Sequence, residues 1–463
     1  MPQAHPNLVF VFPDQFRQQA LGFMKQDPVI TPNFDRFAAE SMVFTHAISN
    51  RPVCSPYRAM LFSGKYPHSN GVLTNCNSQT RQYGCELRAD ERCFTDVLHD
   101  AGYSQGYIGK LHLDAPLDEH EPYTEGRRGD GIIWDAYTPP GPRRHGIDFW
   151  HSYGCCDRHF EPHYWTTDAR VDERIEPHEW SVKHETDVAV EYITNADGKH
   201  RTPGAPFALF VAHNPPHTPF QQVPQRYIEM YGEKTCEELL TRPNVSFDGR
   251  GAQARIHAKN YFAAVTGIDE QFGRVLQAID DAGLREDTIV VFTADHGELM
   301  GSHGLMHKGP WYDECFLVPF VARWPGRIAP GTDDLLLSVP DVYPTLLSAM
   351  GLASHIPPDV QGREYAGALV GGEVDRPSSA LYLNVHPREP AGGMRGLRTH
   401  RYTFVVDRSG EGAEVVHLHD NERDPYQMSD VVEENPDVVE RLEKELDDWL
   451  RRTGDPWRER GRA

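Results

Sequence analysis

The chain has 463 residues and a formal net charge of −22 at pH 7, from 68 acidic and 46 basic residues. This acidic balance disfavours general nucleic-acid binding, which requires a basic face, and it disfavours polyanions outside a local basic pocket. A composition of 39% hydrophobic and 25% charged residues is ordinary for a globular protein of two or three units, and no apolar run reaches the roughly 18 residues that span a bilayer.

The N-terminus and the cysteines bear on where the protein works. Residues 1–6 show no basic stretch leading into an apolar one, so no signal peptide is seen. We expect a cytoplasmic protein as the sequence stands, or a periplasmic or secreted one if the N-terminus was trimmed. The eight cysteines include no Cys-x-x-Cys pair, and a chain of this size does not need disulfides, so we expect mostly free thiols.

Strands and helices alternate along the chain up to about residue 372. Apolar runs predict buried strands at 8–12, 103–108, 207–212 and 288–293, and a shorter strand at 319–323. Helices are expected to begin at Thr31 and Cys54 and to cover 95–100, 253–282 and 341–350. We interpret residues 113–180 as long ordered loops around a site rather than as a core layer. The alternation predicts an α/β domain with a largely parallel sheet.

The pattern changes after residue 372. Short antiparallel strands are expected at 381–385, at 397–398 continuing into 402–406, and at 415–419, followed by an amphipathic helix at 436–452. We therefore divide the chain into a main domain at 1–372 and a smaller C-terminal subdomain at 373–463.

Each of four predicted strands ends in a polar group. These groups are Asp14-Gln15, Lys110 with His112, His213 with His217, and Asp295-His296. Any one of them alone is most simply a loop residue that caps a helix, but ligands of open α/β sheets bind at the carboxyl ends of strands, and four coincidences favour a site. Two carboxylates, an amide oxygen and an imidazole also make a candidate divalent cation site. The oxygens suit calcium, magnesium or manganese, and the imidazole admits manganese or zinc.

One cysteine lies where a helix is expected to begin. Cys54-Ser55-Pro56-Tyr57-Arg58 leads into an apolar run and then into Ser63-Gly64, where the glycine suits a C-terminal cap. Pro56 fits a first helical turn. Backbone N–H groups and the helix dipole favour an anion at Cys54. A lone cysteine in such a place is most simply a small buried residue.

This stretch resembles the signature of the type I sulfatases, which is Cys-x-Pro-x-Arg followed by four residues and Ser-Gly. The resemblance extends from Asn7 to about Arg452. It implies an alkaline-phosphatase-like α/β/α sandwich with a smaller C-terminal α+β subdomain, made of a short antiparallel sheet and a terminal helix. In that family a formylglycine-generating enzyme oxidises the cysteine to formylglycine, and the hydrate of this aldehyde is the nucleophile.

The resemblance also implies roles for the basic residues. Arg58 would support the formylglycine diol, and Lys110, in Gly-Lys-Leu-His, would hold the nucleophile and the sulfate. His112 would help to expel the product. His217, in His-Thr-Pro, would contact the sulfate or the leaving oxygen, and Lys308 would reach the sulfate. His213 has no counterpart in the family pattern and is expected to support these residues or to contact the substrate.

Sulfatases usually bind calcium through an early Asp-Asp pair and a late Asp-Asn or Asp-His pair. Here Gln15 replaces the second early Asp, and His296 fills the late position. The expected ligands are Asp14, Gln15, Cys54, Asp295 and His296. Calcium is the expected ion, with Mn²⁺ as the alternative, because Gln-plus-His versions occur in family branches that include phosphonate monoester hydrolases.

The substrate is expected to be a sulfated small molecule or oligosaccharide, and in particular we expect an exo-acting carbohydrate sulfatase. Residues 139–149 and 388–398 are basic loops, and Arg143 and Arg144 could bind a sugar carboxylate or a neighbouring sulfate. These arginines could equally serve the packing of their own loop. The alternatives are an arylsulfatase, a phosphonate or phosphate ester hydrolase on the same site, and a non-catalytic binder with unmodified Cys54. The sequence leaves the oligomeric state open.

Overall fold

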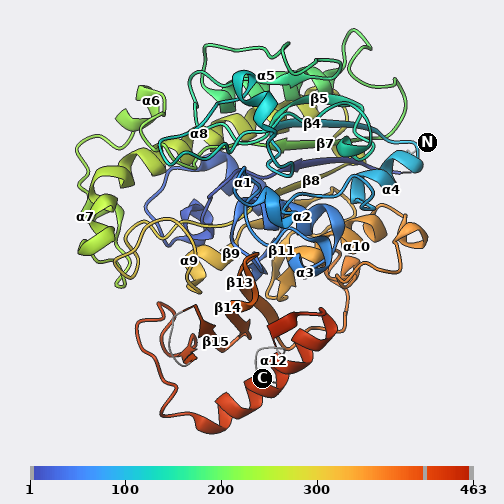
Figure 1. The fold of residues 1–463 in the computed structure, drawn as a ribbon. Coiled ribbons are helices and arrows are strands. Elements are labelled where there is room, and N and C mark those ends of the chain that lie inside the picture. Colours follow the sequence, from blue (N-terminus) through green and yellow to red (C-terminus); the bar gives the residue numbers. More distant parts are fainter. Residues whose placement is uncertain (1–4, 410–413, 458–463) are drawn as a thin grey trace.

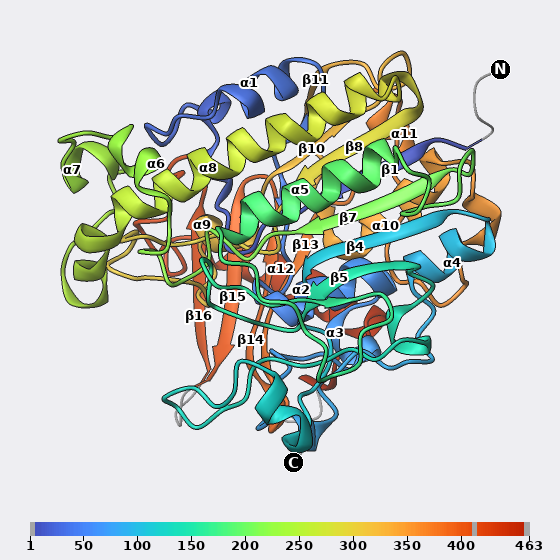
Figure 2. The ribbon, with the colours of Figure 1, turned by 90° about the horizontal axis from the view of Figure 1, so that it is seen from above.

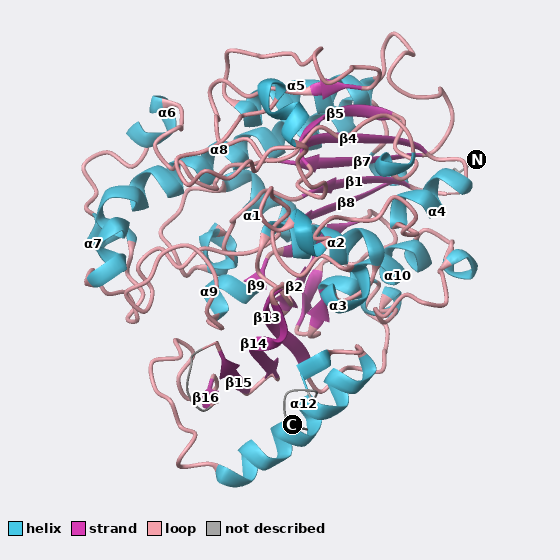
Figure 3. Ribbon diagram, viewed as in Figure 1, coloured by secondary structure: helices cyan, strands magenta, loops and turns pink. Residues whose placement is uncertain are grey.

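A computed structural model describes residues 5–409 and 414–457. The main body is a nine-stranded sheet between two layers of helices, and a four-stranded sheet with the terminal helix α12 (Pro436–Arg452) lies below it in Figure 1. Figure 3 shows the same arrangement by element type. No helix in the described part of the chain is both long enough and apolar enough to cross a membrane.

The strand order of the large sheet is β11-β2-β10-β8-β1-β7-β4-β5-β6. Its parallel part consists of β8 (Thr288–Thr293), β1 (Asn7–Val11), β7 (Phe207–Ala212), β4 (Ser104–Lys110) and β5 (Phe149–Tyr153). On one side β10 (Phe320–Arg323) and β2 (Met42–Phe44) continue the sheet to the edge strand β11 (Gly331–Asp333), and β6 (Trp165–Thr166) is the edge strand on the other side. Every residue of β1, β7 and β8 is buried, which explains why these strands are continuous apolar runs in the sequence.

One helical layer covers each face of this sheet, as Figure 2 shows, and aromatic side chains pack between the layers and the strands. One layer contains α1 (Pro32–Ala39), α5 (Ser181–Thr194) and α8 (Ala254–Asp281), and the other contains α2 (Cys54–Ser63), α4 (Phe94–Asp100) and α10 (Val339–Ala349). Phe34 packs on Phe292 of β8 at 4.3 Å between ring centroids. On the opposite face Phe210 of β7 packs against Phe62 and Phe94.

Smaller elements connect the layers. Three short strands, β3 (Ala47–Ile48), β9 (Leu317–Val318) and β12 (Leu337–Ser338), form a separate sheet. The short helices are α3 (Pro67–Asn70), α6 (Gln225–Glu229), α7 (Cys236–Leu239), α9 (Asp313–Phe316) and α11 (Ala366–Leu369).

The C-terminal sheet is antiparallel in sequence order. Its strands are β13 (Ala380–His386), β14 (Glu389–Arg398), β15 (Tyr402–Arg408) and β16 (Val415–Asp420). It packs on the main body where Tyr382 stacks on Phe316 at 3.9 Å. The helix α12 buries Leu442, Leu446 and Leu450. The expected α/β/α sandwich with a smaller α+β part is confirmed, while the boundary between residues 372 and 373 stays a prediction.

One expectation about the fold is wrong in part. Residues 113–180 are not only loops, because they contain β5 and β6, which extend the main sheet. The strand β5 reads Phe-Trp-His-Ser-Tyr, and its buried His151 and Ser152 hide the apolar pattern of a parallel strand. All eight cysteines lie in the described part of the chain and are unpaired thiols.

Candidate active site

The four polar groups meet at one edge of the sheet. In the register, Val11 of β1 lies beside Val211 of β7 and Phe292 of β8, and Gly109 of β4 lies beside Ala212. The four strands therefore end together, and the loops that follow them face the same space. The N-terminus of α2 enters this space with Cys54 as its first helical residue.

Four charged or polar side chains surround the Cys54 thiol, which is 1% exposed. From Sγ, Asp14 Oδ1 lies at 3.6 Å, His296 Nε2 at 3.5 Å, Lys308 Nζ at 3.5 Å and Lys110 Nζ at 3.9 Å. We call these five residues the nucleophile centre. Burial and the Asp14 carboxylate would raise the pKa of the Cys54 thiol, but Lys110 and Lys308 hold that pKa well below its usual value. An anion at residue 54 is thus stabilised by two ammonium groups.

The expected metal ligands converge in the same place. One ligand atom from each of Asp14, Cys54, Asp295 and His296 lies within 4.8 Å of the others, and all four residues are buried. Gln15 lies beside them, because its main-chain N–H donates to Asp295 Oδ1 at 3.0 Å, and its amide oxygen faces Lys308 Nζ at 3.4 Å. Burial and the neighbouring Asp14 raise the pKa of Asp295 to about 6. Two crowded carboxylates, an amide oxygen and an imidazole are a donor set that fits a divalent cation.

Arg58 lies behind the two carboxylates. Its Nη2 atom lies 3.1 Å from Asp295 Oδ2 and 3.4 Å from Asp14 Oδ2, and its Nη1 donates to the main-chain oxygen of Lys110 at 2.5 Å. The guanidinium also lies over the Phe12 ring at 5.1 Å. It therefore ties α2 to the ends of three strands and holds the carboxylates in place.

A hydrogen-bonded chain leads away from Lys110. Its Nζ lies 2.7 Å from Asp14 Oδ2 and donates to Asn214 Oδ1 at 3.0 Å. Asn214 Nδ2 in turn donates to Asp157 Oδ1 at 3.1 Å, and this oxygen lies 3.6 Å from His217 Nδ1. Sequence reasoning missed Asn214 and Asp157. Asn214 adjoins the singled-out His213, whereas Asp157 follows the unrecognised strand β5.

Two imidazoles at the site differ in charge. Although burial opposes it, Cys155 raises the pKa of His112 to about 9. Burial together with Lys110 and Lys308 lowers the pKa of His217 to about 3. At neutral pH His112 is therefore the cationic imidazole and His217 the neutral one.

The remaining predicted site residues lie outside the nucleophile centre. His213 is buried, and its Nδ1 lies 2.6 Å from Glu185 Oε2, so it supports the loop after β7 rather than meeting a substrate. Arg143 pairs with Asp114 at 2.8 Å and with Glu86 at 3.1 Å.

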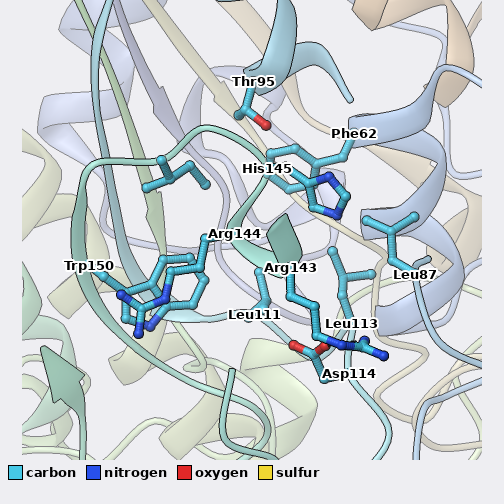
Figure 4. Close-up of a pocket in the computed structure, with 11 residues that line it drawn as sticks. Phe62, Leu87, Thr95, Leu111, Leu113, Asp114, Arg143, Arg144, His145 and Trp150 are labelled. Carbon is cyan, nitrogen blue, oxygen red and sulfur yellow. Dashed lines mark hydrogen bonds and ion pairs between the residues drawn. The ribbon is translucent and has the colours of Figure 1, made fainter. Parts of the chain in front are cut away.

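The contacts of Arg144 are also local. It is buried over Trp150 at 4.7 Å and donates to the main-chain oxygens of Thr138 and Thr167. Figure 4 shows both arginines in a pocket with Phe62, Leu87 and Leu113, and no residue of the nucleophile centre lines this pocket. The expectation that Arg143 and Arg144 bind substrate is therefore not supported, since their groups serve local structure.

Cationic side chains around a buried nucleophile position, at the strand ends of an α/β/α sandwich, define a hydrolase of anionic esters. Comparison with known proteins identifies the family within this class. A family model described as Sulfatase matches residues 6–352, and one described as N-sulphoglucosamine sulphohydrolase, C-terminal, matches residues 301–453. The chain belongs to the sulfatase family and is a sulfuric ester hydrolase. Family membership implies a bound metal and a formylglycine made from cysteine.

Relatives extend over nearly the whole chain. An endo-4-O-sulfatase of Bacteroides thetaiotaomicron is 42% identical, with 98% of this chain and 93% of that protein covered. An ulvan-active sulfatase of Formosa agariphila is 32% identical, with coverages of 96% and 80%. A crystal structure of a sulfatase-family protein from Bacteroides fragilis superposes with a TM-score of 0.93 at 40% identity, covering 99% of this chain and 98% of that one.

Proposed function

We propose that this enzyme releases sulfate from a sulfated carbohydrate, with formylglycine at position 54 and calcium as its metal. The observation that carries the proposal is the convergence of Lys110, Lys308 and the Asp14–Asp295 carboxylates on one buried residue at a helix N-terminus. A sulfate monoester repels nucleophiles by its negative charge, and preorganised cations offset this repulsion and stabilise the charged transition state.

Formylglycine supplies a geminal diol, whose two hydroxyls allow attack on sulfur and later release of sulfate. The ion would be held by Asp14, Gln15, Asp295 and His296, and it supplies Lewis-acid stabilisation of sulfate oxygens. In the unmodified chain, burial lowers the pKa of Lys308 but the charges of Cys54 and Asp14 raise it. Asp14 remains beside Lys308 after Cys54 is oxidised, and the ammonium of this lysine is the proposed proton donor to the leaving oxygen. The neutral His217 is suited to hydrogen-bond the same oxygen.

Relatives support the carbohydrate substrate. One is named as an endo-4-O-sulfatase and another as an ulvan-active sulfatase. The expectation of exo action rested on the long loops at 113–180, with Arg143, Arg144, His145 and several tryptophans. The local contacts of the two arginines weaken that argument. We propose instead that the enzyme accepts sulfate esters within a saccharide chain. It should then release sulfate from longer oligosaccharides at least as fast as from disaccharides.

A phosphonate or phosphate ester hydrolase remains the second candidate, because Gln15 replaces the second early Asp usual in sulfatases and is combined with His296 at the late position. The same cationic site could hold a phosphonate. The two candidates differ in the ester they hydrolyse fastest, since both use the same nucleophile.

The test is a substrate panel with the full chain, co-produced with a formylglycine-generating enzyme. Intact mass first establishes the change of CH₂SH to CHO at residue 54. Rates are then measured on sulfated disaccharides, longer sulfated oligosaccharides, an aryl sulfate and a phosphonate monoester, with Cys54→Ala as the control. Sulfate release from the saccharides at the highest kcat/KM is expected. Faster turnover of the phosphonate would replace the proposal by the second candidate.

A further inference from the structure

We infer that Arg51, His386 and Arg388 form a second anion-binding subsite, which takes a carboxylate or a second sulfate on the sugar next to the scissile ester. We call these three residues the cationic rim. The inference rests on the proposed function and specifies its substrate as a saccharide with two anionic groups.

The cationic rim adjoins the nucleophile centre. Arg51 lies three residues before Cys54, its Nη2 donates to the main-chain oxygen of Val385 at 3.1 Å, and its Nε donates to that of Leu73 at 3.4 Å. The strand β13 therefore runs beside the segment that leads into α2. On its other side, Asn384 Nδ2 donates to Gly309 O at 3.2 Å, next to Lys308 of the nucleophile centre. The turn between β13 and β14 is thus anchored at the edge of the site.

The end of this hairpin is held in a defined shape. The main-chain N–H of Arg388 donates to His386 Nδ1 at 3.2 Å, and Arg388 Nε donates to Tyr83 Oη at 3.0 Å. The Tyr83 and His386 rings meet edge to face at 6.5 Å. His386 and Arg388 are exposed, whereas Arg51 is only 5% exposed. The rim therefore presents two accessible groups above a buried guanidinium.

The cationic rim takes part in none of the ion pairs found among the described residues. Arg51, His386 and Arg388 are absent from these pairs, although the chain carries an excess of 22 negative charges.

The contrast with Arg58 is informative. Arg58 is also buried, and although burial opposes it, the two carboxylates beside its guanidinium raise its pKa. Burial and the nearby Arg395 lower the pKa of Arg51, as expected for a cation without an anion. A bound anion would supply the missing charge, just as Asp14 and Asp295 do for Arg58.

The geometry of the groups defines the ligand class. A guanidinium binds a carboxylate or a sulfate through two parallel hydrogen bonds, and the phenol of Tyr83 adds a polar contact on the same side. A neutral sugar would supply no negative charge to these cations. Both anions share this chemistry, so the experiment distinguishes a uronate carboxylate from a second sulfate.

The experiment compares matched substrates and variants. The substrates are a sulfated disaccharide with a uronate, its carboxyl-reduced form, and a disulfated disaccharide without a carboxyl group. The variants are Arg388→Ala, His386→Ala and, as the control, Arg451→Ala, which removes an exposed arginine from α12. Circular dichroism and the melting temperature establish that each variant folds.

Wild type is expected to prefer at least one acidic substrate over the carboxyl-reduced one by about tenfold in kcat/KM, since charge-assisted hydrogen bonds have this strength. In Arg388→Ala this ratio falls toward one, mainly through KM, while Arg451→Ala keeps it. A preference confined to the uronate or to the disulfated disaccharide identifies the anion. Equal kcat/KM on all three substrates in wild type overturns the inference. So does an unchanged ratio of kcat/KM between acidic and carboxyl-reduced substrates in Arg388→Ala and His386→Ala. Either result leaves the proposed function standing. If wild type releases no sulfate from any saccharide, the proposed function itself fails.

Discussion

The main-chain N–H of Gln15 donates to Asp295 Oδ1 at 3.0 Å, joining loops 280 residues apart in the sequence. Gln15 adopts a left-handed backbone conformation with φ of 63°. Its side-chain amide donates to Glu298, so its oxygen is turned toward Lys308. The pairing explains the amide at position 15, because a carboxylate there would face the buried carboxylate of Glu298.

We therefore expect Gln15→Glu to destabilise the metal-free enzyme. Burial opposes ionisation of Glu298, but His307 lowers its pKa, so the new carboxylate would meet an existing negative charge. The pKa of one of these two carboxyl groups, at position 15 or at Glu298, would then rise above the pKa of a glutamate in the unfolded chain. The free energy of unfolding would fall as pH rises from the unfolded value toward that raised pKa. Thermal melts of the metal-free variant should show a larger loss at pH 8 than at pH 5. Gln15→Ala, which adds no charge, is the control. An equal loss at both pH values would contradict the explanation.

Substitutions at residue 54 test separately the attack on the sulfur atom and the release of sulfate from the enzyme. Cys54→Ala should abolish turnover and keep the fold, because the thiol carbon is the only source of the diol. Cys54→Ser retains one hydroxyl beside Lys110 and Lys308, so at most one sulfate can be transferred per chain. The measurement is product released in the first turnover, with intact mass of the protein. Multiple turnovers by either variant would refute the mechanism.

Removal of the metal should destabilise the enzyme in a pH-dependent way. The pKa of Asp295 in the metal-free chain is about 6, above the ordinary value for an aspartate. At this carboxyl group the metal-free fold therefore binds more protons than the unfolded chain, and the contribution of Asp295 to stability falls as pH rises from the ordinary aspartate value toward 6. Metal binding needs the ionised carboxylate, so its stabilising effect grows over the same range.

At 100-fold excess over Kd the ion adds about 2.7 kcal/mol to the free energy of unfolding. The measurement is the melting temperature with chelator and with added Ca²⁺ or Mn²⁺ at pH 5 and pH 7.5, alongside metal content by mass spectrometry. Asp295→Asn should remove most of the difference between the two conditions. If that variant still bound one ion per chain as tightly as wild type, the metal assignment would be wrong.

Loss of Arg144 should affect stability rather than substrate binding. Its guanidinium combines a cation–π contact with Trp150 and hydrogen bonds to two main-chain oxygens, all within buried surroundings. We expect Arg144→Ala to lower the free energy of unfolding by about 2–3 kcal/mol. The KM for saccharides should stay near that of wild type. A raised KM without a loss of stability would restore Arg144 as a substrate ligand.

The fold was predictable wherever a segment is apolar throughout. The strands β7 and β8 and the helix α12 begin and end where their patterns do, because each is bounded by polar or turn residues. The strand β5 was missed because two of its own buried residues are a histidine and a serine, which interrupt the apolar pattern. Strand ends also located Asp14, Lys110 and Asp295, since parallel strands place their carboxyl ends together.

The surroundings of the site could not be predicted in the same way. Composition marks residues 139–149 as basic, but it does not show that Asp114 and Glu86 already neutralise Arg143. Conversely, Arg51 carries no sequence signal of its own. Its uncompensated charge becomes visible only when β13 is placed beside it. Which charges are paired is a property of tertiary contacts between distant segments.

The contact between Asp157 and His217 leads to the last prediction. Asp157 accepts a hydrogen bond from Asn214, is paired with Arg128 at 2.6 Å, and lies 3.6 Å from His217 Nδ1. Although burial opposes it, His217 and Arg128 lower the pKa of Asp157, so it is a carboxylate at neutral pH. It thereby orients His217 and, through Asn214, the ammonium of Lys110.

We expect Asp157→Asn to lower kcat about 10- to 100-fold with a small change in KM, because it misplaces groups that act on the leaving oxygen. The variant also removes a negative charge beside His217, which lowers the pKa of this imidazole further and shifts the acidic limb of the pH–rate profile to lower pH. The control is Asp130→Asn, an exposed carboxylate of the same loop region, which should leave the profile unchanged. A loss of kcat in Asp157→Asn with an unshifted profile would show that Asp157 only stabilises its loop through Arg128.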